Sequence, residues 1–292
     1  MYPARFEYHA PGDLEEAVGL LRQLGPEAKL LAGGCSLIPL MKLRLAEPPH
    51  LVDLRKVPGL AHLAEEDGWL RLGALTTEAE IERSQLLARS YPILVDASSV
   101  IADPTVRNMG TVGGNLAHAD PANDHPAVMV ALGAELVARG PDGERTISID
   151  DFFLGLFETA MDSSEVLTEI RVPVPAPGSG SAYVKFERQV GDYAIAGAAA
   201  CVRLADGLLE EAKVALTNLG DIATRAGEAE RMLLGRAPDD ETLRAASEAS
   251  ASELSPWDDL RASAEVKLKL ASVAMYRALG SAVRRAQGGL NG

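Results

Sequence analysis

The segment VPVPAPGSGS, residues 172–181, constrains the fold more than any other stretch, because it interrupts the regular patterns on both sides of it. Its prolines cannot continue a helix or a central strand, and its glycines favour turns. Strand and helix patterns alternate through the first 175 residues, which favours an α/β or α+β fold over a β-sandwich. We therefore predict a domain boundary here, and 292 residues suffice for two or three domains of about 100–150 residues each.

Local patterns predict individual elements on both sides of this boundary. A helix is predicted over 13–24, because its apolar residues share one face, Asp13 and Glu16 can form a capping box, and Gly25 follows. A second capping box, Thr77 with Glu80, predicts a helix that extends to about residue 89. The remaining predicted elements are strands at 28–32, 50–54 and 68–77, a helical stretch from 36 through LIPLMKLRL, a hairpin that turns at 205–207, and helices beyond 226, the last at 258–286.

Charge and cysteine content exclude several classes of protein. A net charge of −14 argues against nucleic acid or an anionic membrane as the main partner. The only cysteines, Cys35 and Cys201, lie far apart, which excludes a disulfide scaffold, a Cys-ligated iron–sulfur cluster and a zinc site built on Cys pairs. No secretory signal and no apolar run of about 18 residues is found, so we expect a cytoplasmic protein.

Two double glycines are the strongest candidates for a functional site. Gly33 and Gly34 lie in LLAGGCSLIPLMK, and Gly113 and Gly114 lie in DPTVRNMGTVGGNLAHADPANDHP, a segment that we predict to be irregular. Glycine pairs commonly serve only tight turns. Alternatively, their backbone N–H groups could converge on one diphosphate, which the missing Cβ atoms would allow to approach. Neither pair matches the Rossmann dinucleotide fingerprint or the P-loop.

Other chemically active residues have a plainer interpretation beside the functional one. His118, Asp120, Asp124 and His125 look like metal ligands, but we expect them to cap turns and helix starts, because no helical His-x-x-x-His spacing is present. Asp124 could instead accept hydrogen bonds from a sugar or ribityl hydroxyl. Cys35 could be an activated thiol, although we expect a small apolar filler. From pattern alone, Lys185 is a surface charge and Tyr193 a core aromatic.

Three segments together resemble one known family. LLAGGCSLIPLMKLRLAEPPHLVDL, VRNMGTVGGNLAHADPANDHP and YVKFERQVGDYAIAGAAA resemble the FAD-binding medium subunit of the molybdenum hydroxylases, the carbon monoxide dehydrogenase and xanthine dehydrogenase family. The similarity extends to DLRASAEVKLKLASVAMYRAL near the C-terminus. It implies an α+β chain with an FAD-binding domain of the vanillyl-alcohol-oxidase (PCMH) type in two α/β subdomains, residues 1–57 and 58–177. Residues 178–292 would form a C-terminal domain of a small, three-stranded antiparallel sheet with helices.

The resemblance also implies which residues hold the cofactor. Residues 32–36 and 111–115 resemble the two diphosphate loops, Asp124 the carboxylate that holds the polyol, and Lys185 and Tyr193 groups near the flavin ring. Cys35 stands where many relatives have His, Gln or Thr, which puts the hydrogen bonding of that side chain in doubt. The full implied set is Leu31, Ala32, Gly33, Gly34, Cys35, Ser36, Leu37, Ile101, Ala102, Thr111, Gly113, Gly114, Asn115, Asp124, Leu167, Lys185 and Tyr193.

The implied function is electron transfer through noncovalent FAD. Partner subunits would hold the [2Fe-2S] centres and the molybdopterin, in a dimer of heterotrimers, and no residue of this chain is expected to catalyse a step or to bind a metal. One alternative is a self-sufficient flavin reductase or oxidase of the same fold, in the manner of the enolpyruvoyl-glucosamine reductases. The other is a scaffold subunit that keeps the fold but has lost the flavin.

Overall fold

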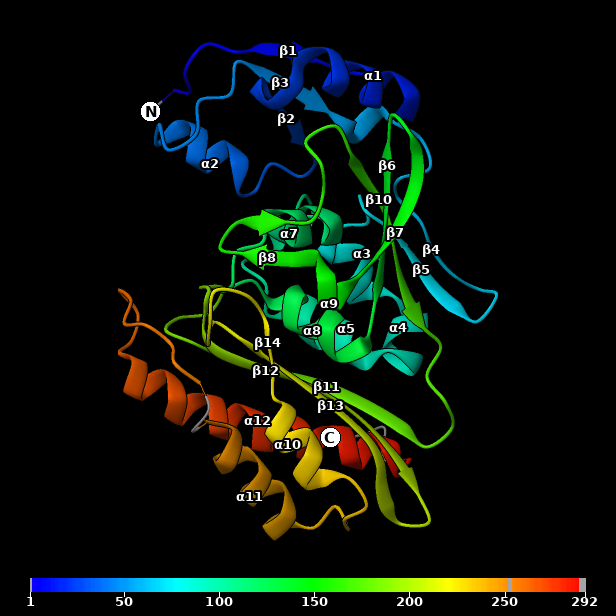
Figure 1. The fold of residues 1–292 in the computed structure, drawn as a ribbon, viewed down its shortest axis with the longest axis vertical. Coiled ribbons are helices and arrows are strands. Elements are labelled where there is room, and N and C mark those ends of the chain that lie inside the picture. The colour runs from blue at the N-terminus through cyan, green and yellow to red at the C-terminus, as the bar shows by residue number, and fades with distance from the viewer. Residues whose placement is uncertain (1, 252–253, 289–292) are drawn as a thin grey trace.

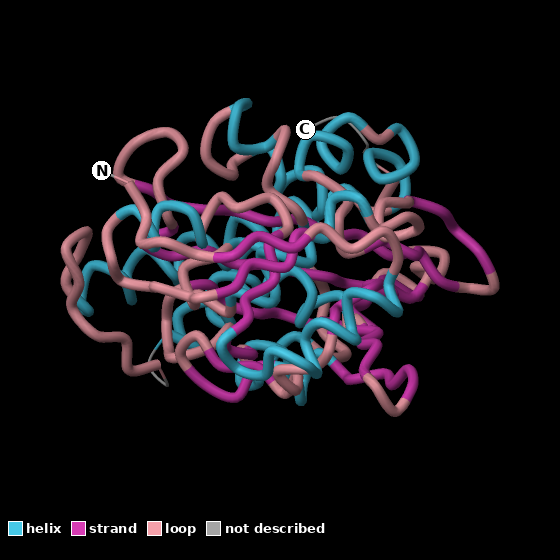
Figure 2. Tube along the Cα trace, turned by 90° about the horizontal axis from the view of Figure 1, so that it is seen from above, coloured by secondary structure: helices cyan, strands magenta, loops and turns pink. Residues whose placement is uncertain are grey.

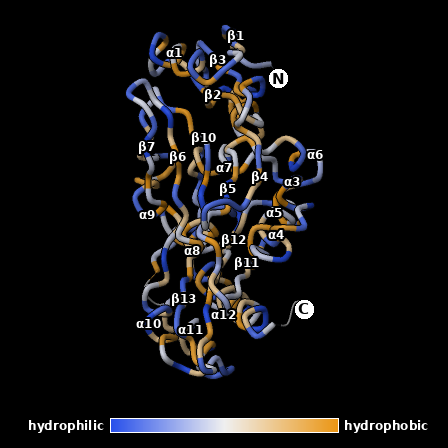
Figure 3. Tube along the Cα trace, turned by 90° about the vertical axis from the view of Figure 1, so that its right-hand side faces the viewer, coloured by the Kyte–Doolittle hydropathy of each residue, from blue (hydrophilic) through white to orange (hydrophobic). Residues whose placement is uncertain are grey.

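Three sheets of three or more strands follow one another along the long axis of the molecule, each with helices packed on it (Figures 1 and 3). This computed structural model describes residues 2–251 and 254–288. Seen along the perpendicular direction in Figure 2, most strands lie in the middle of the view, with helices and loops around them. Within the described residues, no helix is both long and apolar enough to cross a bilayer.

The N-terminal sheet is parallel and has the order β1-β3-β2, formed by β1 (Glu7–His9), β3 (His50–Asp53) and β2 (Ala28–Leu31). Helix α1 (Leu14–Leu24) confirms the prediction for 13–24, with Asp13 as its N-cap and Gly25 at φ +63° after its last residue. The Glu16 carboxylate accepts from the amide of Gly12 and not from that of Asp13, so the box is only half formed. Helix α2 (Leu37–Lys42) ends earlier than predicted.

The middle sheet is antiparallel, with the order β4-β5-β10-β6-β7. Its strands are β4 (Leu63–Glu66), β5 (Trp69–Gly73), β6 (Glu135–Gly140), β7 (Gly143–Ser148) and β10 (Val166–Pro173). Around it lie α3 (Glu78–Arg83), α4 (Gln85–Ser90), α5 (Pro92–Ser99), α6 (Pro104–Arg107), α7 (Val112–His118), α8 (Asp124–Leu132), α9 (Ile149–Phe152) and the hairpin β8 (Phe153–Gly155) with β9 (Glu158–Thr159).

Several predictions for this part were wrong in detail. The strand predicted at 68–77 ends at Gly73, and β4 was not foreseen. The Thr77–Glu80 capping box is present, but the predicted helix is divided at Ser84, whose side chain caps α4 by accepting from the amide of Leu87. The segment predicted to be irregular contains α6, α7 and the start of α8, so Gly113 and Gly114 lie in the first turn of a helix.

The C-terminal sheet is antiparallel and lies between two groups of helices (Figure 1). Its strands are β11 (Ser179–Glu187), β12 (Ala194–Ala205), β13 (Leu208–Thr217) and the two-residue β14 (Thr224–Arg225), one more than the three strands implied by the resemblance. Helices α5 and α8 cover one face and α12 (Ala264–Ala286) the other, beside α10 (Gly227–Leu233) and α11 (Asp240–Ala251). Residues 258–263 were wrongly predicted as helical, because Ser263 is the N-cap of α12.

Alternation along the strands of this sheet explains why both of its faces are buried. Ala199 and Ala215 belong to the core shared with the middle sheet, whereas Ala198, Ala200 and Val214 belong to the core shared with α12. The predicted hairpin turn is confirmed, with Asp206 at φ +50° and Gly207 at φ +78°. The predicted break shrinks to residues 174–178, because Pro173 still ends β10 and β11 begins at Ser179.

Candidate functional site

The structure brings the two glycine pairs together, although about eighty residues separate them in the chain. A Cβ atom on Gly33 would lie 2.0 Å from the carbonyl oxygen of Met109 and 3.0 Å from the Cα of Gly110. On the other side, a Cβ atom on Gly114 would lie 3.7 Å from the Cβ of Ala32. We call residues 32–36 the first corner and residues 110–115 the second corner. Their backbones touch, so a side chain at Gly33 has no room.

The two corners differ in the hydrogen bonds of their amides. In the first corner, the N–H groups of residues 33–36 donate to no acceptor within the described part of the chain. In the second corner, Gly113 donates to the carbonyl of Ala74 at 2.9 Å, and Gly114 donates to the hydroxyl of Thr111 at 3.1 Å. The expectation that both pairs present free amides was therefore wrong for the second pair, and the unsatisfied donors lie in the first corner.

Packing accounts for the second glycine pair. A Cβ atom on Gly113 would lie 2.5 Å from the Cβ of Ala74, so only glycine lets α7 approach the end of β5 this closely. A Cβ atom on Gly114 would lie 2.8 Å from the Thr111 hydroxyl that caps the helix. Both glycines thus bring α7 to its place beside the first corner, which is a role in shape rather than in hydrogen bonding.

Asn115 carries a polar atom that the fold leaves unsatisfied. Its Oδ1 is buried and accepts no hydrogen bond from the described residues, while its backbone carbonyl accepts from the side-chain amide of Asn123 at 2.9 Å. Buried acceptors of this kind nearly always find a partner, because leaving one unpaired costs about 1–3 kcal/mol. This orphaned acceptor follows Gly114, which lies beside Ala32 of the first corner, and it suits a bound polar ligand such as a dinucleotide.

Asp124 and Lys185 form a buried ion pair. Lys185 Nζ lies 3.1 Å from one oxygen of Asp124, and the Tyr183 hydroxyl donates to the other oxygen at 2.7 Å. The Lys185 and Asp124 side chains are 2% and 6% exposed, so the interpretation of Lys185 as a surface charge was wrong. Burial raises the pKa of Asp124, against the opposing effect of the Lys185 charge and of the hydrogen bond from Tyr183.

Strand periodicity explains how this pair forms. Tyr183 and Lys185 are two residues apart in β11, so both side chains leave the same face of the sheet, the one covered by α5 and α8. Asp124 is the first residue of α8. Sequence reasoning missed Tyr183, although its place two residues before Lys185 in an alternating segment was a usable signal.

Segment 100–102 lies between this ion pair and the loop before β12. The ammonium of Lys185 also donates to the carbonyl of Val100 at 3.0 Å, and Ala102 has φ +44°. A Cβ atom on Gly191 would lie 2.7 Å from the carbonyl oxygen of Ala102. The structure therefore brings Ile101 and Ala102 close to both Lys185 and the loop that carries Tyr193.

Tyr193 and Leu167 differ in exposure. Tyr193 is 40% exposed and lies under the Arg261 guanidinium, 5.3 Å from the ring centroid, so the interpretation as a core aromatic was wrong. Arg261 is held there by Asp192 at 2.7 Å. Leu167 is 6% exposed within β10, a strand that packs against α7. Leu167 therefore belongs to the core under the second corner, and Tyr193 lies at the surface.

Cys35 is not an activated thiol. Its Sγ lies 3.8 Å from the carbonyls of Gly33 and Val106, and partial desolvation together with the negative charges of Glu78 and Asp103 raises its pKa. A thiolate nucleophile needs the opposite environment. The side chain is exposed beside the corner and gives no sign of redox chemistry of its own.

The four residues considered as metal ligands have separate partners. Asp124 pairs with Lys185, the Asp120 carboxylate accepts from the amide of Ala122, and the His118 ring packs against Phe157. His125 is fully buried and its Nε2 lies 2.7 Å from the carboxylate of Glu78, which also accepts from the Ser98 hydroxyl. These contacts tie α8 to α3 and α5, as expected for structural residues.

The His125–Glu78 pair predicts a pH dependence of stability. Burial acts to lower the pKa of His125, but the Glu78 carboxylate outweighs it, so the pKa is raised above 6.5. The pair's contribution is therefore fully present below pH 6.5 and is lost as the pH rises through the raised value. Urea unfolding between about pH 5.5 and 9 should show the wild type losing stability relative to His125→Gln. Parallel curves for the two proteins would contradict this assignment.

Comparisons with known proteins agree with this geometry. Residues 4–175 match the family model "FAD binding domain in molybdopterin dehydrogenase", and residues 181–282 match "CO dehydrogenase flavoprotein C-terminal domain". The chain is 45% identical over 285 residues to the carbon monoxide dehydrogenase medium chain of Hydrogenophaga pseudoflava, covering 98% of this chain and 99% of that one. It is 30% identical to the xanthine dehydrogenase FAD-binding subunit of Escherichia coli O157:H7, covering 97% and 98%.

Solved structures show the same similarity across the whole chain. A carbon monoxide dehydrogenase from Hydrogenophaga pseudoflava that lacks the Mo-pyranopterin moiety matches with a TM-score of 0.95 and 47% identity, covering 98% of this chain and 99% of that one. Quinoline 2-oxidoreductase from Pseudomonas putida 86 matches with a TM-score of 0.92 and 34% identity over the full length of both chains. The chain therefore belongs to the FAD-binding medium subunits of the molybdenum hydroxylases, an oxidoreductase family.

Proposed function

We propose that this chain holds FAD noncovalently across the two corners and conducts electrons from a partner's iron–sulfur centre to an external acceptor. The observation that carries the proposal is the backbone contact of Gly33 with Met109 and Gly110, because it makes one site of two distant segments. Bound FAD would supply the redox chemistry, since no side chain of the site is arranged as a nucleophile or general base. The protein's part is placement and electrostatics.

Each residue of the site has a role that its chemistry suits. The free amides of residues 33–36 would donate to the pyrophosphate, and the glycines of both corners bring the two segments together beside it. Asp124 would accept from the polyol, and the Lys185 ammonium would be a positive neighbour for the flavin ring. The proposed contacts are Leu31, Ala32, Gly33, Gly34, Cys35, Ser36, Leu37, Ile101, Ala102, Thr111, Gly113, Gly114, Asn115, Asp124, Leu167, Lys185 and Tyr193.

Electrons must enter from another polypeptide, because two cysteines cannot ligate an iron–sulfur cluster. We propose an iron–sulfur small subunit and a molybdopterin large subunit as partners, in a cytoplasmic dimer of heterotrimers, with substrate oxidised on the large subunit. We also propose domains at 1–57, 58–177 and 178–292. The N-terminal sheet ends at residue 53, the middle sheet spans residues 63–173, and the C-terminal sheet begins at residue 179. These limits support the division.

Expression of the chain alone and with its two partners tests the proposal. The isolated chain should be yellow and should release FAD on denaturation, and it should not oxidise a hydroxylase substrate or turn over a nicotinamide. In the complex, substrate should bleach the flavin absorbance, and omission of the iron–sulfur subunit should prevent bleaching. The measurement is the visible spectrum during anaerobic addition of substrate.

Two other outcomes would favour the alternatives. Steady turnover of a nicotinamide by the isolated chain would identify a self-sufficient flavin reductase. A colourless protein that assembles with both partners would identify a scaffold subunit. Either result would overturn the electron-transfer proposal.

A further inference from the structure

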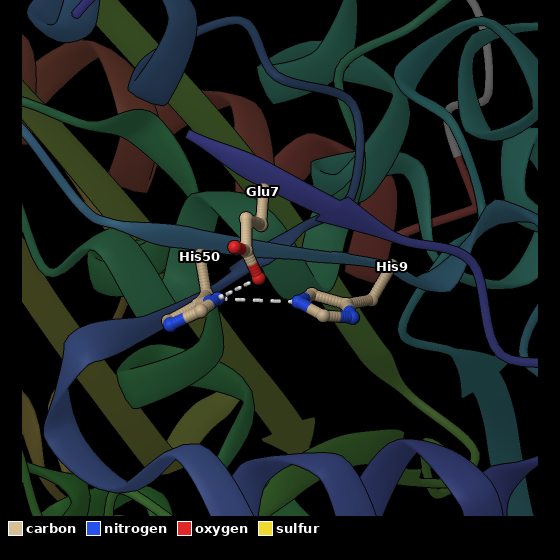
Figure 4. A group of neighbouring side chains, drawn as sticks. All are labelled: Glu7, His9 and His50. Atoms are coloured by element: carbon tan, nitrogen blue, oxygen red, sulfur yellow. Dashed lines mark hydrogen bonds and ion pairs between the residues drawn. The ribbon is translucent and has the colours of Figure 1, made fainter. Parts of the chain in front are cut away.

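Three side chains outside the two corners converge on one point of the N-terminal sheet (Figure 4). Glu7 and His9 come from β1 and His50 from β3, and one ligand atom of each lies within 4.8 Å of the other two. Among the described residues, this is the group of His, Cys, Asp and Glu side chains that meets this geometric requirement for a metal ion. The sequence motifs predicted no metal site in this chain.

Strand geometry creates this convergence. Glu7 and His9 are two residues apart in β1, so both side chains leave the same face of the sheet. Strands β1 and β3 are parallel with Glu7 directly opposite His50, which puts the imidazole of His50 beside both. The intervening Tyr8 belongs to the other face, where its hydroxyl donates to Asp53 at 2.6 Å.

Two of the three distances fit a tetrahedral metal ion. His9 Nε2 lies 3.2 Å from His50 Nδ1, and His50 Nδ1 lies 3.5 Å from a carboxylate oxygen of Glu7. Two nitrogens bound tetrahedrally to Zn²⁺, each at about 2.0–2.1 Å, are about 3.3 Å apart. The third pair, His9 Nε2 and the Glu7 carboxylate, lies within 4.8 Å, so the exposed Glu7 side chain has to move inward for all three groups to share an ion.

We propose that Glu7, His9 and His50 form a binding site for a divalent transition-metal ion, with Zn²⁺ the ion that the donor set suits best. Two imidazoles and one carboxylate are a common zinc donor set, and a fourth position stays open to water. An ion can reach the site from solvent, because the Glu7 side chain is 74% exposed and that of His50 is 19% exposed. In Figure 4 the remaining ring nitrogens of both histidines point away from the shared centre.

A bound ion would join β1, at the edge of the sheet, to the central strand β3. Strand β1 has only three residues and is held by β3 alone, so it is weakly anchored. Ion binding to the folded state alone would stabilise that state through mass action. The proposal depends on the N-terminal sheet and not on flavin, so it stands or falls separately from the proposed function.

Calorimetric titration of the untagged, flavin-loaded full chain with ZnCl₂ tests this site. We expect one ion per chain and a rise in Tm on zinc addition. His9→Asn and His50→Asn should each weaken zinc binding by at least about tenfold, and Glu7→Gln should weaken it less, because an amide oxygen can still ligate. Flavin content and the circular dichroism spectrum should be unchanged in all three variants.

His62→Asn is the matched control, because it removes another partly exposed histidine that lies 3.0 Å from a glutamate, Glu169, but has no second histidine beside it. This variant should bind zinc like the wild type. If the two histidines share only a hydrogen bond, zinc should give no saturable heat and no change in Tm. That result, or equal zinc affinity in the wild type, His9→Asn and His50→Asn, would overturn the proposal.

Discussion

Lys185→Met should destabilise the chain by about 3–5 kcal/mol and abolish its retention of flavin, because removal of one partner leaves a buried charge uncompensated. Asp124 is 6% exposed in its side chain, and only the Tyr183 hydroxyl would remain to satisfy it. Loss of the ammonium would also release the carbonyl of Val100, and with it the segment that carries Ile101. Urea unfolding and flavin content after gel filtration measure the two effects.

A double variant and a surface variant control this experiment. Lys185→Met with Asp124→Asn removes both charges, so it should recover much of the stability lost in Lys185→Met, although not the flavin. Lys213→Met removes an amine that pairs with Glu211 at 3.0 Å but is 38% exposed, and it should cost only about 0–1 kcal/mol. Full flavin content in Lys185→Met would contradict the assignment of Lys185 to the site.

Local signals predicted much of the fold correctly. Asp13 and Gly25 cap the two ends of α1, and Thr77 and Glu80 form their capping box. Asp206 and Gly207 form the turn of the hairpin. Each of these features is decided by residues within a few positions of one another, which is why sequence alone suffices. The division of the predicted helix at Ser84 was missed although its cause is local too, because the Ser84 side chain caps α4 by accepting from the amide of Leu87.

The candidate site was harder to predict, because its contacts join distant segments. The glycine pairs were identified, but their separate roles depend on Ala74, which packs against Gly113, and on amides that only the structure shows to be free. The Tyr183 hydroxyl donates to Asp124, which lies 59 residues earlier in the sequence. The Glu7–His9–His50 group depends on a parallel register between β1 and β3 that no local pattern specifies.

Gly33→Ala should force the two corners apart and should cost both stability and flavin. The new Cβ atom would lie 2.0 Å from the carbonyl oxygen of Met109 and 2.7 Å from its carbonyl carbon, and backbone atoms cannot move aside as a flexible side chain could. Overpacking typically costs about 1–3 kcal/mol, and a clash with backbone belongs at or above the upper end of that range. Chemical unfolding and flavin titration of the purified variant give the two values.

Gly19→Ala separates this effect from the general consequences of replacing a glycine. Gly19 lies in α1, no heavy atom beyond its chain neighbours and the backbone of its own helix lies within 4 Å of the position its Cβ would take, and alanine favours a helix over glycine by about 1 kcal/mol. Gly19→Ala should therefore be as stable as the wild type or more stable, with full flavin. If Gly33→Ala also keeps wild-type stability and flavin, the two corners can separate without loss of the cofactor. The proposal that both corners form one flavin site would then be wrong. Loss of flavin in Gly33→Ala alone would instead show that the contact between the corners is what the cofactor requires.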